Sequence, residues 1–232
     1  MTPIPITRVA LSWSSGKDSA WTLHRLRQDP AIEVAALVTT VNAEFERVAM
    51  HAVRRELLHA QAEAAGLPLI EVPIPYPCSN ADYEARMRAL LEQLRGERIA
   101  HMAFGDLFLA DIRAYREKQL QGTGITPLFP LWNEPTGALA RAMIAGGLEA
   151  MLTCVDPTRL APEFCGRRFD AALLAALPEG VDPCGEHGEF HSFAYAGPMF
   201  GAPIAVETGV TVARDGFVFT DLQKSKKSGS ES

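Results

Sequence analysis

The sequence predicts an α/β fold, with a parallel β-sheet in the N-terminal part and a smaller α+β part after it. Up to about residue 131, short apolar runs alternate with segments of helical periodicity, the pattern of βαβ units. The run 34–41, VAALVTTV, is almost continuously apolar, which is typical of a strand buried on both faces. Later segments change character, so we expect two domains and a disordered tail, at 1–131, 132–222 and 223–232.

The N-terminal elements follow from apolar spacing and from glycine stops. Strands are expected at 9–11, 34–41, 69–72 and 99–104, and helices at 18–26, 48–65 and 81–94. Gly66 and Gly96 close the second and third helices. Because the carboxyl ends of parallel strands meet at one edge of a sheet, we expect residues 14–19, 39–42 and 105–106 to lie together there.

The second half gives a less regular pattern. A helix from Asp111 is expected to end near Gly122, and the Pro-rich segment 126–132 is expected to be an extended connector, since proline is unfavourable inside a sheet. Helices are predicted at 136–144 and 170–177, and strands at 150–155 and 190–195. The segment 204–222 alternates apolar and polar residues around an Arg-Asp-Gly turn at 214–216, which predicts a terminal hairpin.

Composition and charge exclude several classes of protein. The chain has 232 residues, of which 47% are hydrophobic and 22% charged, an ordinary globular balance. Its formal net charge of -6 argues against general nucleic-acid binding. No charged leader followed by a long apolar run is present, and no stretch approaches eighteen apolar residues, so we expect a soluble, cytoplasmic protein without membrane contact. Four cysteines without a CxxC pair are expected to be free thiols, and we predict no metal site from them: Cys78, Cys154, Cys165 and Cys184.

The segment 11–20, LSWSSGKDSA, predicts an anion site between the first strand and the first helix. The N–H groups of Ser15, Gly16 and Lys17 can converge there, next to the positive end of the helix and the Lys17 ammonium. The hydroxyls of Ser14 and Ser19 could hold further oxygens. A Walker A loop is excluded, since it requires glycine at position 11 and serine or threonine at position 18. The alternative is an ordinary strand-to-helix turn.

A second polar segment follows the fourth predicted strand, at 105–118. Gly105 and Asp106 leave that strand, and a helix then carries Arg113 and Arg116 three residues apart. Residues at this spacing share a helix face, so both guanidinium groups could reach one phosphate or carboxylate. The alternative is a solvated face on which Arg113 pairs with Glu117.

The segment 182–200 gathers carboxylates and imidazoles around two glycines. Glycine permits sharp turns, so four side chains could converge on one point: Glu186, His187, Glu189 and His191. Such a group could bind a metal, orient ammonia or act as a general base. Two histidines at this spacing are insufficient for us to predict a metal site, and an exposed turn is the alternative.

Taken together, these motifs resemble a known family. The loop SSGKDS resembles the PP-loop of the ATP pyrophosphatase superfamily, whose pattern is SGGKDS, with Ser15 in place of the second glycine. With Gly105-Asp106, residues 111–116 and the GEHGEF sequence at 185–190, the chain is similar over most of its length to the diphthine ammonia ligase family. The resemblance implies a Rossmann-like (HUP-type) sheet and an ATP-dependent ligase that uses Mg²⁺.

The family implies a reaction and roles for the residues that match its motifs. A substrate carboxylate attacks the α-phosphate of ATP, pyrophosphate leaves, and ammonia then displaces AMP to form an amide. ATP would be held by the loop and the strand exit, namely Ser14, Ser15, Gly16, Lys17, Asp18, Ser19, Gly105 and Asp106. Catalytic roles would fall to Lys17, Glu186 and Glu189. The acid substrate would be bound by Arg113, Arg116, His187 and His191.

Two departures from the family pattern fall where the acceptor would bind. Known members carry an acidic residue where this chain has His191, and their post-strand motif reads closer to SDYQR than to the ADIR at 110–113. The acceptor therefore stays unidentified, and a homodimer is possible. Two other functions stay open: a non-catalytic adenine-nucleotide-binding module, and a tRNA-modifying PP-loop enzyme, which would need a thiol near the loop.

Overall fold

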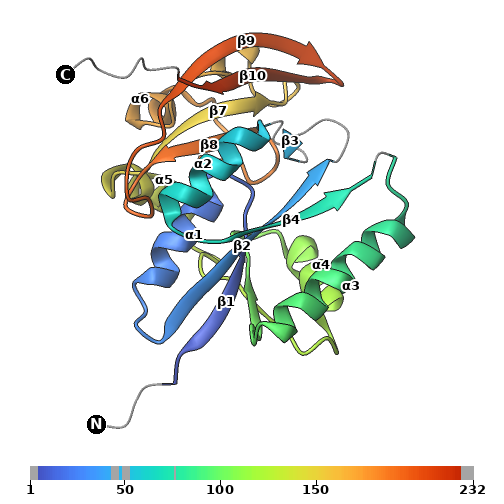
Figure 1. Cartoon of the computed structure of the whole chain (residues 1–232). Coiled ribbons are helices and arrows are strands. Elements are labelled where there is room, and N and C mark those ends of the chain that lie inside the picture. Colours follow the sequence, from blue (N-terminus) through green and yellow to red (C-terminus); the bar gives the residue numbers. More distant parts are fainter. Residues whose placement is uncertain (1–4, 43–46, 49–52, 76, 226–232) are drawn as a thin grey trace, which may run out of the picture.

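A parallel β-sheet forms the N-terminal half of the computed structural model, which describes residues 5–42, 47–48, 53–75 and 77–225 (Figure 1). Its parallel strands run in the order β4-β2-β1-β5-β6. Their bounds are Leu69–Ile74, Ile32–Asn42, Thr7–Ser12, His101–Ala103 and Thr126–Leu128. Strands are added first on one side of β1 and then on the other, so the switch point of a doubly wound sheet lies between β1 and β5.

Helices cover both faces of this sheet, as the alternation of side chains in β1 requires. Val9 and Leu11 pack in one apolar cluster with α1 (Lys17–Arg27) and α2 (Arg55–Ala65). Ala10 packs in a second cluster with α3 (Asn80–Gly96) and Leu120 of α4 (Ala110–Leu120). The predicted fold class, a parallel Rossmann-like sheet with a smaller α+β part, is confirmed.

A four-stranded antiparallel sheet forms the C-terminal part, in the order β8-β7-β10-β9. These strands span Phe190–Ala196, Glu149–Val155, Phe217–Lys224 and Val206–Arg214. They are accompanied by α5 (Thr136–Ala145), a 3₁₀ turn at Pro162–Phe164 and α6 (Ala171–Ala176). The sheet lies over α1 and α2 (Figure 1) and extends their apolar cluster through Leu152, Phe193 and neighbouring residues. The two sheets therefore share one core.

One predicted helix begins later than expected. The helix expected at 48–65 begins at Arg55, and Val48 instead belongs to the short strand β3 (Arg47–Val48), which pairs antiparallel with the end of β2. Residues 49–52 of that predicted helix lie outside the described residues. Gln223 and Lys224, the first residues of the predicted tail, instead pair with β9. Residues 226–232 of the predicted tail also lie outside the described part.

The Pro-rich segment 126–132 contains a strand that the sequence did not predict. Thr126–Leu128 forms β6 at the edge of the parallel sheet and pairs with β5 alone. Proline is tolerated at an edge because no further strand needs its missing N–H. The adjoining strand β5 is also shorter than the expected 99–104. None of the helices in the described part of the chain combines the length and apolar character that crossing a bilayer would take.

Candidate functional site

The loop 13–16 connects β1 to α1 at the carboxyl edge of the parallel sheet. The Thr39 hydroxyl donates to the carbonyl of Trp13 at 2.6 Å, which ties the start of the loop to β2. Ser15 adopts a left-handed backbone with φ 67°, and the amide of Ala20 then donates to the carbonyl of Gly16 as the helix begins. A Cβ on Gly16 would lie 3.2 Å from the Ser192 carbonyl oxygen, so glycine permits this close approach to β8.

Lys17 is almost completely buried at the first position of α1, with 2% of its surface exposed. Its ammonium group donates to the Asp18 carboxylate at 2.8 Å and to the carbonyl of Cys184. It also lies 5.4 Å from the centroid of the Phe190 ring. Burial alone would lower the pKa of Lys17, but the adjacent Asp18 raises it above its usual value. Lys17 is therefore a fixed positive charge inside the site.

The segment 182–192 faces the loop from the C-terminal sheet. Gly185 has φ 70°, and a Cβ there would lie 2.9 Å from the Phe190 carbonyl oxygen, so the tight turn requires glycine. The Glu186 carboxylate accepts a hydrogen bond from the Leu107 amide at 2.8 Å. Burial raises the pKa of Glu186 to about 7, whereas burial, with a smaller effect of Lys17, lowers the pKa of His191 to about 4. Near neutral pH the site thus holds a carboxyl group able to exchange a proton and an uncharged imidazole.

The exit of β5 forms the third wall. A Cβ on Gly105 would lie 3.1 Å from the carbonyl carbon of Asp18, so glycine lets this exit reach α1. The Asp106 carboxylate lies 3.6 Å from the Arg116 guanidinium. Burial raises the pKa of Asp106, and Arg116 partly opposes that rise. Arg116 also lies over the Phe104 ring at 5.0 Å, which fixes the direction of its side chain.

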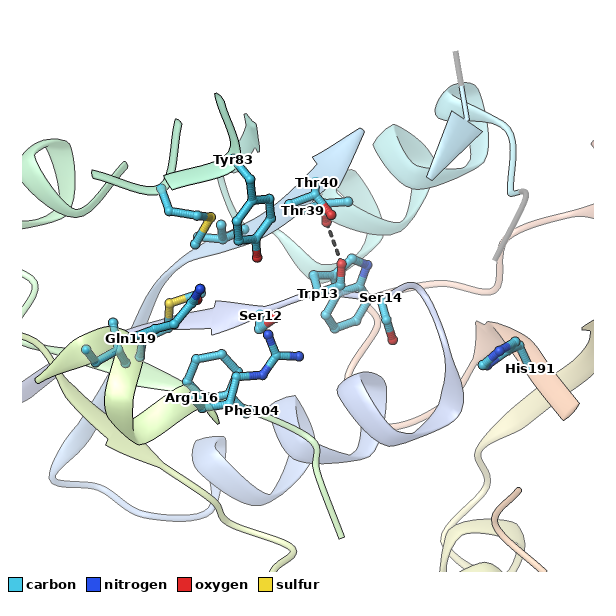
Figure 2. Close-up of a pocket in the computed structure, with 14 residues that line it drawn as sticks. Ser12, Trp13, Ser14, Thr39, Thr40, Tyr83, Phe104, Arg116, Gln119 and His191 are labelled. Atoms are coloured by element: carbon cyan, nitrogen blue, oxygen red, sulfur yellow. Dashed lines mark hydrogen bonds between the residues drawn. The ribbon is translucent and has the colours of Figure 1, made fainter. Parts of the chain in front are cut away.

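Two neighbouring cavities that share part of their lining lie between these walls, each of about 250 Å³. The first, called the loop cavity here, is lined by Ser14 and Gly16 of the loop 13–16 (the anion loop), and by Lys17, Asp106 and Glu186. The side chamber, drawn in Figure 2, is lined by more apolar and hydroxyl-bearing residues that include Thr39, Tyr83 and Phe104. Both are bordered by Ser12, Ser14, Phe104, Arg116 and His191. A polar compartment that holds the cations of Lys17 and Arg116, next to a partly apolar one, fits a phosphorylated nucleoside.

Most of the predicted site residues meet in the loop cavity. They are Ser14, Gly16, Lys17, Asp18, Ser19, Gly105, Asp106, Arg116, Glu186 and His191. In Figure 2 the Arg116 side chain reaches inward from α4, and His191 approaches from β8 on the opposite side. Residues from three separate segments of the sequence are therefore brought to one place.

Four predicted site residues in the described chain lie outside both cavities. Arg113 donates to Glu117 at 2.8 Å and packs on Phe129 and Trp132. Arg113 thus has the alternative arrangement, the pair with Glu117, and of the two arginines only Arg116 lines the cavities in this structure. His187 is exposed and lies against the Phe108 ring. Glu189 is buried and accepts a hydrogen bond from the Asp182 amide. Ser15 is a buried residue of the loop 13–16.

Known proteins match the chain over both of its sheets. The family model described as the diphthamide synthase N-terminal domain matches residues 7–127, and the model of the C-terminal domain of the same synthase matches residues 136–227. The chain belongs to the diphthamide synthase family. The diphthine–ammonia ligase of Rattus norvegicus is 26% identical over 245 residues, covering 96% of this chain and 91% of the relative. The Homo sapiens diphthine–ammonia ligase is also 26% identical, covering 93% and 88%.

Among solved structures, a tRNA thiolase from Methanococcus maripaludis matches with a TM-score of 0.38 and 18% identity, over 61% of this chain and 58% of that one. This likeness is too low to carry a functional argument. The ligase relatives are only about a quarter identical to this diphthamide synthase family member. The acceptor that it uses must therefore be argued from its own site.

Sequence reasoning missed several residues at the site of this diphthamide synthase family member. Tyr83 on α3 lines the side chamber, and Ser192 on β8 accepts from the Lys17 amide at 3.2 Å. Cys184 lines the loop cavity and supplies a carbonyl to Lys17. Gln61 contacts the loop from α2. Only Gln61 had a visible signal, because it is the one polar residue within the otherwise apolar buried stripe of α2.

Proposed function

We propose that this protein is an ATP-dependent, AMP-forming ligase that activates a carboxylate and converts it to an amide with ammonia. The observation that carries the proposal is the meeting of Lys17, Arg116 and Glu186 around one cavity at the switch point of the sheet. The names of the relatives suggest a diphthine-type acid as the first acceptor to test.

The ATP half of the proposal is supported by charge and by position. The triphosphate would lie in the loop cavity against Lys17 and Arg116, and the nucleoside would occupy the side chamber beside Tyr83 and Phe104. Mg²⁺ is usually held by one or two carboxylates together with phosphates, and Asp18 and Asp106 are suited to that role. The substrate carboxylate would attack the α-phosphorus, and the bond from that phosphorus to pyrophosphate would break. Fixed positive charge stabilises the leaving pyrophosphate.

In the amide-forming step, Glu186 would accept the proton that ammonia loses. Ammonia would attack the acyl carbon, the bond to the AMP oxygen would break, and the nitrogen would release a proton. A carboxyl group with a pKa of about 7 can accept that proton near neutral pH. Glu189 stays a proposed second carboxylate: it is buried with one oxygen unpaired among the described residues, yet it does not line the cavity.

Sulfur transfer is a weaker proposal for this site. Cys184 lies at the loop cavity, as a thiolation enzyme would need, but burial raises the pKa of its thiol to about 12. The thiolate is the reactive form, so this sulfur is a poor nucleophile near neutral pH. A purely nucleotide-binding role also leaves Glu186 and its raised pKa unexplained.

Oxygen tracing tests the proposed reaction. The protein is incubated with Mg-ATP, ammonium and diphthine whose carboxylate carries ¹⁸O, with simpler carboxylic acids as comparison acceptors. The proposal requires AMP and pyrophosphate as products, with one ¹⁸O atom in the AMP. Formation of ADP, or of AMP without the label, would contradict a mechanism through an acyl adenylate.

A further inference from the structure

Gln61 of α2 joins three segments at the back of the anion loop. Its side chain is completely buried. The amide oxygen accepts from the Trp13 indole N–H at 2.8 Å, and the amide nitrogen donates to the carbonyls of Ser15 at 2.9 Å and Ala194 at 2.6 Å. One side chain of α2 thus links two residues of the loop 13–16 to β8.

The orientation of this amide is fixed by chemistry. An indole N–H can only donate and a backbone carbonyl can only accept, so the Gln61 oxygen must face Trp13 and the nitrogen must face the two carbonyls. Both N–H groups and the oxygen are therefore used. Few other side chains of similar size could supply one acceptor and two donors from the same position.

The residue that Gln61 holds is conformationally unusual. Ser15 has φ 67°, a left-handed conformation that serine rarely adopts, and its buried hydroxyl has no hydrogen-bond partner among the described residues. Its carbonyl accepts from Gln61 and also from the Ala194 amide at 3.0 Å. These two bonds oppose rotation of the peptide that precedes Gly16 and Lys17, the groups that face the loop cavity.

We propose that Gln61 is a positioning residue that holds Ser15 in the left-handed conformation and thereby keeps the loop shaped for a phosphate group. The proposal rests on the proposed function, because it takes the loop cavity as the ATP site. Gln61 does not line the cavity and acts only through the loop. Its contribution is greatest with serine at position 15, since glycine would adopt the same φ without support.

Two measurements on Gln61→Met test the proposal. Hydrogen exchange of the segment 12–20 is measured without nucleotide, and calorimetry measures binding of an ATP analogue with a methylene α,β bridge. We expect exchange of the segment to quicken at least tenfold and the analogue to bind about tenfold more weakly. Adding Ser15→Gly to the variant should restore most of the affinity. Leu26→Ala, which alters a buried residue in the last turn of α1, away from both cavities, is the control for lost stability and should leave the affinity unchanged.

A milder variant covers the case in which Gln61→Met does not fold. Gln61→Glu keeps an oxygen for Trp13 and loses both N–H donors, but its protonated form, which burial favours, supplies one O–H donor in their place, so a roughly threefold loss of affinity is expected. Unchanged exchange of the segment 12–20 would overturn the proposal, as would an affinity loss that Ser15→Gly does not reduce. If the wild-type protein does not bind the analogue, the proposed function fails instead, and the exchange result still shows whether Gln61 holds the loop.

Discussion

Replacing Glu186 by glutamine should make the protein more stable in alkaline solution while it removes the proposed base. The glutamine oxygen can still accept from the Leu107 amide, so the local geometry is retained. In the folded chain the pKa of Glu186 is raised from its ordinary value of 4.5 to about 7, mainly by burial. The folded state therefore binds the extra proton more tightly than the unfolded state, and the resulting stabilisation is complete below pH 4.5 and lost as the pH rises through 7.

The size of the effect follows from the pKa difference. A change from 4.5 to about 7 corresponds to about 3 kcal/mol in full, and partial exposure of the side chain reduces this to about 2 kcal/mol. The free energy of unfolding of Glu186→Gln, relative to that of the wild type, should thus rise by about 2 kcal/mol between pH 5 and pH 8 in urea unfolding. Amide formation should fall about 100-fold or more.

The control is Glu92→Gln, which removes the same charge from an exposed position on α3. Its free energy of unfolding, relative to that of the wild type, should change little between the two pH values. If Glu186→Gln behaves in the same way, the raised pKa and the role built on it are both refuted.

Three further predictions concern the cavity and its loop. Lys17→Ala should weaken calorimetric binding of the methylene ATP analogue at least tenfold, about 1.4 kcal/mol, and equal affinity would remove the loop as the triphosphate site. Arg116→Ala should lower kcat/KM for ATP about 10-fold or more, because Arg116 borders both cavities. Arg113→Ala on the same helix should have little effect, because Arg113 packs on Trp132 instead. Similar losses in both variants would contradict the different roles given to the two arginines. Ser15→Gly should raise the free energy of unfolding by about 1 kcal/mol and Tm by about 3 °C. The reason is that glycine removes both the left-handed backbone strain and the unpaired buried hydroxyl of Ser15. A lower Tm would show that the strain is absent.

Sequence patterns that span only a few residues were sufficient to predict most of the helices and strands. The apolar run in β2, the glycine after α2 and the Asp215-Gly216 turn each act within a few residues, and each lies where expected. Val48 was misread because apolar spacing alone cannot distinguish a helix from a strand that pairs with the end of β2. β6 was missed because Pro127 excludes an interior strand but not an edge strand.

The candidate site was predictable where one motif carries several polar groups. Lys17 and Glu186 were selected from local spacing, and the topology then brings them to one cavity. The sequence could not show which arginine of α4 faces the cavities. The direction of each side chain depends on an aromatic ring from another segment, Trp132 for Arg113 and Phe104 for Arg116. The domain boundary at residue 131 stays a prediction.

The hydrogen bond between the Lys17 amide and the Ser192 hydroxyl joins residues 175 positions apart. A growing chain makes the segment around Lys17 near the start of synthesis, long before Ser192 exists. Contacts between distant segments carry a larger loop-closure cost than local ones, and the strands of the parallel sheet all precede Ser192 in the chain, so this sheet can assemble while the loop 13–16 still lacks its wall from β8. If the loop cavity binds ATP as proposed, the binding site is complete only when nearly all of the chain has been made.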